Sequence, residues 1–130
     1  MPQIRVSQAA GLLGVSDDTI RRWIDGGQLA ASLDDAGRKV LDGAGLAAFA
    51  RAQATATPDP SGVRRSARNR FVGLVTDVRV EGLVAQVELQ CGPHRLVSLM
   101  TAEAARELAL TEGSVAVAVV KATQVVVETT

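Results

Sequence analysis

The chain has very few aromatic residues. Its 130 residues include one Trp, two Phe and no Tyr, so a hydrophobic core has to be built from Val, Leu, Ile and Ala. This length corresponds to one ordinary domain or to two very small ones. Because very small domains bury a low fraction of their surface, we expect oligomerisation to complete the core.

Signals for catalysis, for a metal cation and for a membrane are also missing. The single cysteine, Cys91, excludes an intramolecular disulfide and fits a reducing cytosol, so we expect a cytoplasmic protein. No apolar run approaches the roughly 20 residues of a membrane span, and the first residues do not open a signal peptide. The single histidine, His94, has no second ligand at metal-binding spacing, and no catalytic triad, paired carboxylates, phosphate loop or dinucleotide fingerprint is present. We therefore expect no enzyme, no metal-cation site, no organic cofactor and no membrane partner.

The net charge is zero, but the charges are unevenly distributed. Basic residues are in surplus near the middle of the chain, at Arg64, Arg65, Arg68 and Arg70, where Asp59 is the nearest acidic residue. The regions on either side are neutral or acidic. Bulk positive charge is therefore not what would hold this chain to a nucleic acid.

The pattern of apolar residues divides the chain into an α+β arrangement of two small domains. Residues 1–53 have helical spacing with Gly-containing turns, and residues 64–130 alternate with a period of two. Residues 54–63 have linker composition, with two prolines and little to bury, so we expect them to be extended and mobile. In the first domain the expected elements are helices at 8–13, 17–24 and 43–53 and a hairpin at 29–32 and 38–41. In the second domain they are strands at 69–80, 83–90, 94–100, 114–121 and 124–128 and a short helix at 102–108.

The first domain carries a helix-turn-helix pattern. Two short helices joined by a turn containing Gly form such a unit, and its second helix enters the major groove of DNA. The pattern lies in residues 6–10, 13–16, 19–23 and 27–29. In these segments the chain resembles the mostly α-helical winged helix-turn-helix domain of the MerR and excisionase families. The resemblance implies contact with double-stranded DNA through the second helix and the wing, by Thr19, Arg21, Arg22, Arg38 and Lys39.

Acidic residues in the same elements favour a different interpretation. Asp17 and Asp18 begin the second helix, and Asp34 and Asp35 lie in the wing, where all four would repel phosphate. The alternative is a helical module that serves packing or protein contact.

The second domain begins and ends with groups that suit a small anion. Ser66 offers a hydroxyl, Arg68 a planar guanidinium and Asn69 an amide, all just before a strand. Five short strands with one helix between the third and fourth favour a five-stranded OB-like β-barrel.

These residues also carry a resemblance. Ser66, Ala67, Arg68 and Asn69 open the domain, and Lys121, Ala122 and Thr123 close it. With this pattern, the chain resembles the molbindin (Mop) domain of the TOBE superfamily over residues 65–128. The resemblance implies that molybdate or tungstate binds at interfaces of a homo-oligomer, a dimer or a dimer-based hexamer. It implies an oxyanion site made of Ser66, Ala67, Arg68, Thr101, Lys121, Ala122 and Thr123.

Two functions fit the combination of domains. The first is a molybdate-responsive transcriptional regulator. The second is a molybdate or tungstate storage or buffering protein whose helical domain is an adaptor. A third and weaker possibility is a barrel that binds a molybdopterin derivative instead of the bare oxyanion.

Overall fold

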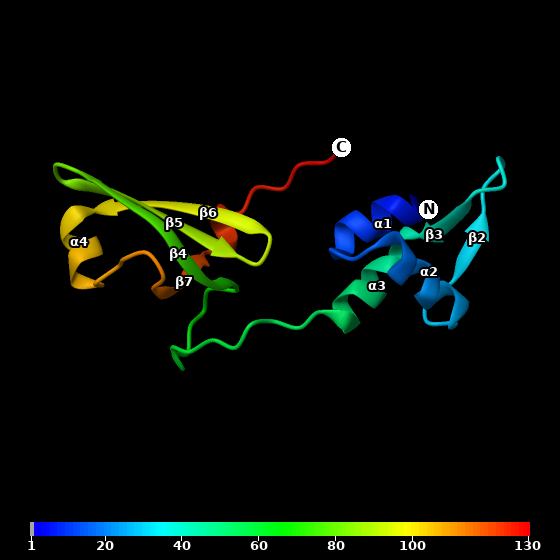
Figure 1. Cartoon of the computed structure of the whole chain (residues 1–130), viewed down its shortest axis with the longest axis horizontal. Helices are drawn as coiled ribbons and strands as arrows, with labels where there is room; N and C mark the ends of the chain where they lie inside the picture. Colours follow the sequence, from blue (N-terminus) through cyan, green and yellow to red (C-terminus); the bar gives the residue numbers. More distant parts are fainter. Residues whose placement is uncertain (1) are drawn as a thin grey trace. The chain divides into compact units, whose positions relative to one another are not determined.

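The computed structural model describes residues 2–130, which form two compact units (Figure 1). One unit ends at Ala56 and the other comprises Thr57–Thr130. Within the described residues, no helix is long and apolar enough to cross a membrane.

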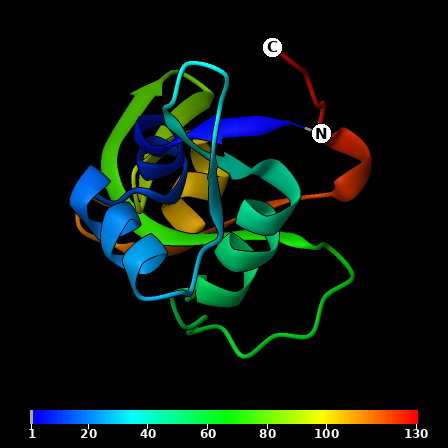
Figure 2. The ribbon, with the colours of Figure 1, turned by 90° about the vertical axis from the view of Figure 1, so that its right-hand side faces the viewer.

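The N-terminal unit contains three helices and a small antiparallel sheet (Figure 2). The sheet has the order β1-β3-β2, with Ile4 opposite Leu41 and Ser32 opposite Val40. The β2–β3 hairpin projects from the helices (Figure 2). In chain order the elements are β1 (Gln3–Arg5), α1 (Val6–Leu13), α2 (Asp17–Asp25), β2 (Ala31–Leu33), β3 (Lys39–Asp42) and α3 (Gly43–Gln53). The three helices and the hairpin expected from the sequence are present, and β1 adds a third strand.

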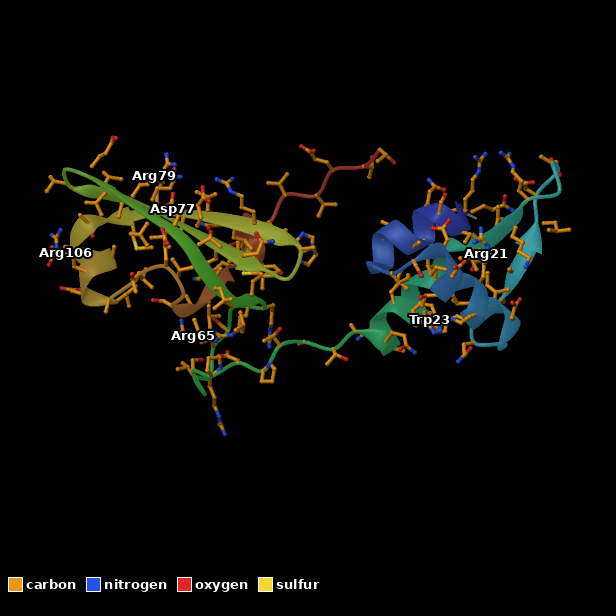
Figure 3. The ribbon with its side chains drawn as sticks, in the orientation of Figure 1. Arg21, Trp23, Arg65, Asp77, Arg79 and Arg106 are labelled. Carbon is orange, nitrogen blue, oxygen red and sulfur yellow. The ribbon has the colours of Figure 1, made fainter. Side chains whose placement is uncertain are left out.

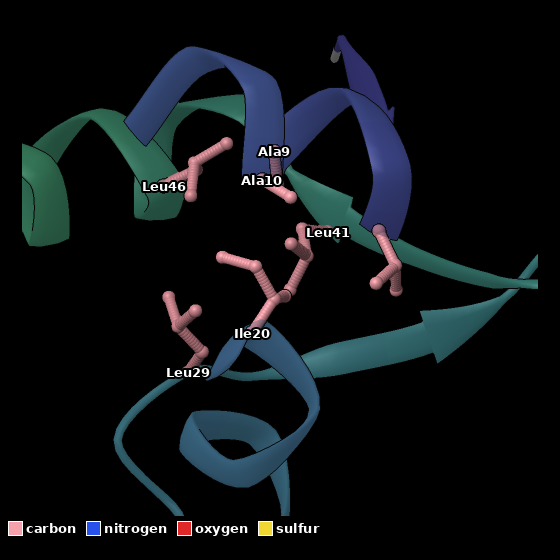
Figure 4. Close-up of a cluster of buried hydrophobic side chains, with 7 residues drawn as sticks. Ala9, Ala10, Ile20, Leu29, Leu41 and Leu46 are labelled. Carbon is pink, nitrogen blue, oxygen red and sulfur yellow. The ribbon is translucent and has the colours of Figure 1, made fainter. Parts of the chain in front are cut away.

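The core of the N-terminal unit lies between the helices and the sheet (Figure 4). Ile20 of α2 is completely buried, and it meets Ala9 of α1, Leu41 of β3 and Leu46 of α3 in one cluster. Trp23 packs against this cluster, and the centroid of its ring lies 4.9 Å from that of the Phe49 ring. This cluster is closed within the unit, although Leu12 and Leu33 remain 70% and 65% exposed.

The C-terminal unit is a four-stranded antiparallel sheet with one short helix, in the strand order β6-β5-β4-β7. The long strand β4 (Asn69–Glu81) has two partners. Its first half pairs with β7, with Asn69 opposite Val120, and its second half pairs with β5, with Glu81 opposite Val84. The register shifts between Val75 and Asp77, which is where a strand of this length can bend. The elements are β4 (Asn69–Glu81), β5 (Val84–Cys91), β6 (His94–Thr101), α4 (Ala102–Glu107), β7 (Val115–Val120) and the 3-10 turn η1 (Ala122–Gln124).

The curled antiparallel sheet of the expected barrel is present in residues 2–130, but with four of the expected five strands. The fifth strand, expected at 124–128, is replaced by η1 and by residues 125–130, which have no regular structure. Among the described strands β6 pairs only with β5, and β7 pairs only with β4, so the curled sheet has two free edges. Three consecutive valines favour a strand by composition, but a strand also requires a neighbouring strand to pair with, and none lies beside them here.

The core of the C-terminal unit lies on the inner face of this sheet. Val75, Val87, Leu89 and Cys91 are buried together there. Many other apolar side chains of the unit remain exposed, including Leu99 at 71% and Val126 at 84%. The unit therefore leaves much apolar surface that its own chain does not cover.

Candidate functional site

The residues at the two ends of the second-domain pattern meet at one end of the sheet. Asn69 begins β4 opposite Val120 at the end of β7, and the Nδ2 group of Asn69 donates a 3.1 Å hydrogen bond to the carbonyl of Val120. Asn69 and Val120 form the last pair of this ladder, and Arg68 and Lys121 are the next residues along the two segments. The sheet thereby brings the segments that carry these two basic residues to the same end, although they are far apart in the sequence.

The remaining residues at this end supply small polar groups. Ser66 and Ala67 lie in the irregular segment just before β4, and Ala122 and Thr123 form η1 just after β7. All of them except the half-buried Ala67 are exposed, as are Arg68 and Lys121. Two cationic groups with hydroxyl and backbone donors can bind a compact dianion.

Thr101 lies at the other end of the sheet. It pairs with Val84, which pairs with Glu81 at the far end of β4 from Asn69. An extended strand of the 13 residues of β4 is roughly 40 Å long, and Figure 1 shows α4, which follows Thr101, far from η1. The Oγ1 atom of Thr101 caps α4 by accepting a 3.0 Å hydrogen bond from the amide of Ala104. Within one chain, Thr101 does not join the other predicted residues.

A further cationic residue at this end was not predicted from the sequence. Arg70 lies in β4 two residues after Arg68, and its Nη2 group donates to the carboxylate of Asp59 and, over 3.1 Å, to the hydroxyl of Ser61. Asp59 also accepts a 2.8 Å hydrogen bond from the amide of Ser61. That amide, the Ser61 hydroxyl and the Arg70 guanidinium lower the pKa of Asp59 to about 2. Residues 59–61, which have linker composition, thus form a turn bonded to β4.

The sequence gives only a weak signal for this contact. The residues Asp59, Pro60, Ser61 and Gly62 are typical of a tight turn, and Gly62 has a positive φ of 61°. Nothing in the spacing indicates that Arg70 is the partner of that turn.

In the N-terminal unit, the predicted DNA-contacting residues of α2 are present on its exposed side. The hydroxyl of Ser16 caps the helix by accepting a 3.1 Å hydrogen bond from the amide of Thr19. The Nη1 group of Arg21 lies 3.3 Å from the carboxylate of Asp18, and the Nη2 group of Arg22 donates to the hydroxyl of Thr19 over 3.0 Å. Figure 3 labels Arg21 on this helix.

The hairpin carries the other two predicted residues, Arg38 and Lys39, which are both exposed. Asp34 accepts a hydrogen bond from the amide of Arg38 and a second from its side chain, 3.2 Å away. The backbone amide of Arg38 is the main cause that lowers the pKa of Asp34. Two of the predicted basic residues, Arg21 and Arg38, therefore already have an acidic partner within the unit.

The C-terminal unit is a small β-sheet domain, and one end of its sheet carries basic and hydroxyl side chains. Residues 65–127 match the family model described as the TOBE domain. The second half of the chain therefore carries a TOBE domain. No curated protein matches the chain.

Of three solved structures similar to this chain, two are described as molybdate-binding proteins and one as MopII. A molybdate-binding protein from Sporomusa ovata is 25% identical, with a TM-score of 0.50, over 52% of this chain and 100% of that one. MopII from Clostridium pasteurianum is 31% identical, with a TM-score of 0.48, over 51% of this chain and 100% of that one. The cytoplasmic molybdate-binding protein ModG is 40% identical, with a TM-score of 0.46, over 49% of this chain and 46% of that one. All three matches cover about half of the present chain.

Proposed function

We propose that this chain binds molybdate or tungstate at the end of the sheet where β4 and β7 meet. The observation that carries the proposal is the register of Asn69 with Val120, because it brings the segments that contain Arg68 and Lys121 to the same end of the sheet. The TOBE match and the similarity to the Sporomusa ovata protein support the choice of ligand. Arg68 and Lys121 neutralise the dianion, while Ser66 and Thr123 donate hydroxyl hydrogens and the backbone of Ala67 and Ala122 contributes amides.

Calorimetric titration of the whole chain with sodium molybdate tests this site. Arg68→Ala and Lys121→Ala should each weaken binding roughly 10- to 100-fold, since each removes a charged hydrogen-bond donor. Arg79→Ala is the matched control, because this arginine lies on the same strand and already pairs with Asp77 (Figure 3). Unchanged affinity in both site variants would contradict the assignment.

The site belongs to a homo-oligomer in this proposal. Thr101 completes a site only if it comes from another copy, since it lies at the far end of its own sheet. A groove of 280 Å³ lined by β6, β7 and the residues after α4 is largely apolar, and Leu74 and Val115 are exposed side by side on β4 and β7. A second copy that covers these surfaces would supply the burial that a unit of this size lacks.

Light scattering of the whole chain with and without molybdate tests the assembly. We expect a multiple of two chains, with hexamers as the largest closed form, and Val115→Asp should reduce the mass because it places a charge on an apolar contact. Glu112→Gln, in the nearby turn, controls for a change of charge outside the apolar surface. A wild-type protein that stays monomeric at all concentrations would rule out shared sites.

We propose that the N-terminal unit is a helix-turn-helix domain that binds DNA. Together with molybdate binding by the C-terminal unit, this would make the chain a molybdate-responsive transcriptional regulator. The support is an exposed Arg22 with no acidic partner among the described residues, on a helix followed by a projecting hairpin. The specific observation that favours the alternative, a storage or buffering protein with an adaptor unit, is the pairing of Arg21 with Asp18 and of Arg38 with Asp34.

Selection of bound sequences from random duplex DNA by the whole chain separates the two functions. A regulator yields one enriched sequence, with a salt-dependent affinity that Arg22→Ala reduces by at least about tenfold. Arg51→Ala, on α3, is the matched control. If no sequence is enriched while molybdate still binds, the storage function is the one that stands.

A further inference from the structure

Arg70 lies next to the proposed oxyanion site but faces an internal carboxylate. It follows Arg68, which directly precedes β4, by two residues; in an extended chain this spacing is roughly 7 Å and puts both side chains on one face. Its cross-strand neighbour is Val119, and Lys121 follows Val119 by two residues, just beyond the end of β7. Arg70 is therefore within reach of the space between the two residues proposed to bind the anion.

One end of the Arg70 guanidinium is left unsatisfied. Its Nη2 group is bonded to Asp59 and Ser61, whereas its Nη1 group is buried and has no hydrogen-bond partner in residues 2–130. The side chain as a whole is 20% exposed. A buried cationic donor without an acceptor is unfavourable, and such atoms in folded proteins call for an acceptor that the chain itself does not provide.

We propose that Arg70 is a third cationic residue of the oxyanion site and that Asp59 competes with the anion for it. This inference rests on the proposed binding of molybdate or tungstate between Arg68 and Lys121. A tetrahedral dianion there repels the Asp59 carboxylate and offers oxygen acceptors to the guanidinium, so Arg70 exchanges one anionic partner for another.

The exchange has a structural consequence within the C-terminal unit. Asp59 and Ser61 form the turn that precedes Arg64 and Ser66, and Arg70 bonds this turn to β4. When Arg70 turns to the anion, the turn at 59–62 loses its contact with the strand. Binding of the anion and attachment of this segment are therefore linked and oppose one another.

Calorimetric titration of four full-length proteins with sodium molybdate tests the competition. Asp59→Asn should raise the affinity at least about fivefold, and Arg70→Gln should lower it by a similar factor. In the Arg70→Gln background, Asp59→Asn should change the affinity less than about twofold, because the group for which Asp59 competes is gone.

Asp77→Asn is the matched control for charge. Asp77 also pairs with an arginine of β4, Arg79, at 2.9 Å, and its side chain is 31% exposed against 32% for Asp59. The control should leave the affinity unchanged. As a second measurement, the carboxyl ¹³C resonance of Asp59 should move on addition of molybdate toward its position in Arg70→Gln.

The outcomes separate this inference from the function on which it rests. If Arg68→Ala and Lys121→Ala weaken binding while Asp59→Asn does not strengthen it, the competition is overturned and the oxyanion site stands. An equal gain from Asp59→Asn with and without Arg70 also overturns it, since the carboxylate would then act by charge alone. Absence of molybdate and tungstate binding in the wild-type protein overturns both.

Discussion

The two units of this chain bury their apolar residues in different ways. In the N-terminal unit, α1, α2, α3 and β3 surround Ile20, which is fully buried. In the C-terminal unit, the sheet has two free edges, and apolar side chains such as Leu99 and Val126 remain exposed. The two units thus differ in how much apolar surface one chain leaves exposed, since Leu12 and Leu33 are the large apolar side chains exposed in the described part of the N-terminal unit.

This difference indicates what each unit is built to do. In the N-terminal unit the buried cluster around Ile20 holds α1, α2, α3 and β3 together within one chain. In the proposed oligomer, other copies would cover the exposed apolar side chains of the C-terminal unit, so a ligand shared between copies would stabilise the assembly by mass action. Variants that act on only one unit are the sharpest way to examine this comparison.

The largest effect is expected for Ile20→Ala. Removing most of a fully buried side chain leaves a cavity and should lower the free energy of unfolding of the N-terminal unit by about 2–5 kcal/mol. Scanning calorimetry of the whole chain should show the transition of this unit at a lower temperature, independent of protein concentration. The affinity for molybdate should not change. If Ile20→Ala lowered both the stability of the N-terminal unit and the affinity for molybdate, the two units would not fold separately.

Gly73→Ala should have the next largest effect, in the C-terminal unit. A Cβ atom at this position would lie 2.5 Å from both the Sγ atom of Cys91 and the carbonyl oxygen of Gln90, so the backbone of β4 or β5 has to move. Overpacking of this kind costs about 1–3 kcal/mol. Scanning calorimetry should show the unfolding transition of the C-terminal unit at a lower temperature. The transition of the N-terminal unit in the same sample should not move.

Gly45→Ala is the control for this substitution. Gly45 lies in α3, where the nearest atom to an added Cβ is the Oδ2 atom of Asp42 at 3.7 Å, an ordinary contact. Alanine in a helix is favoured over glycine by roughly 0.5–1 kcal/mol, so the same change should stabilise the N-terminal unit. Destabilisation by both variants would contradict the account of Gly73.

The local elements of both units could be predicted from the sequence because each depends on neighbouring residues. Helices were expected at 8–13, 17–24 and 43–53, and the alternation from Asn69 to Lys121 predicted four strands that the structure contains. Glycine with positive φ ends the first helix at Gly14 and turns the chain at Gly82. These features need no information about distant parts of the chain.

The features that depend on distant partners were harder to predict. A strand was expected at 124–128 because β-branched residues favour strands, but no edge lies beside them in this chain. Thr101 was grouped with Arg68 and Lys121 in a site shared between chains; the register puts it at the opposite end of its own sheet, and its place in a shared site stays a prediction. The contact of Asp59 with Arg70 spans 11 residues and follows no spacing rule.

A smaller effect is expected from the two hydroxyl caps, one in each unit. The Ser16 hydroxyl accepts from the amide of Thr19 and the Thr101 hydroxyl from that of Ala104, over 3.1 and 3.0 Å. Replacing either by alanine should cost about 1 kcal/mol. In chemical unfolding, Ser16→Ala should lower the free energy of unfolding of the N-terminal unit and Thr101→Ala that of the C-terminal unit. A variant that destabilised the other unit instead would contradict the fold.

The smallest effect is a change in the titration of Asp59. Its pKa is about 2 because the amide and the hydroxyl of Ser61 bond to the carboxylate and Arg70 pairs with it. The folded pKa is below the ordinary value, so the contact of the turn with β4 is fully formed above about pH 4 and is lost as the pH falls through 2. In Arg70→Gln, NMR titration of the Asp59 carboxyl should give a midpoint that rises only part of the way to the ordinary value, because the Ser61 amide is the first cause. If the pKa of Asp59 returned completely to its ordinary value in Arg70→Gln, the turn itself would depend on Arg70. Binding of Arg70 to an anion would then disorder the turn at 59–62 as well as detach it from β4.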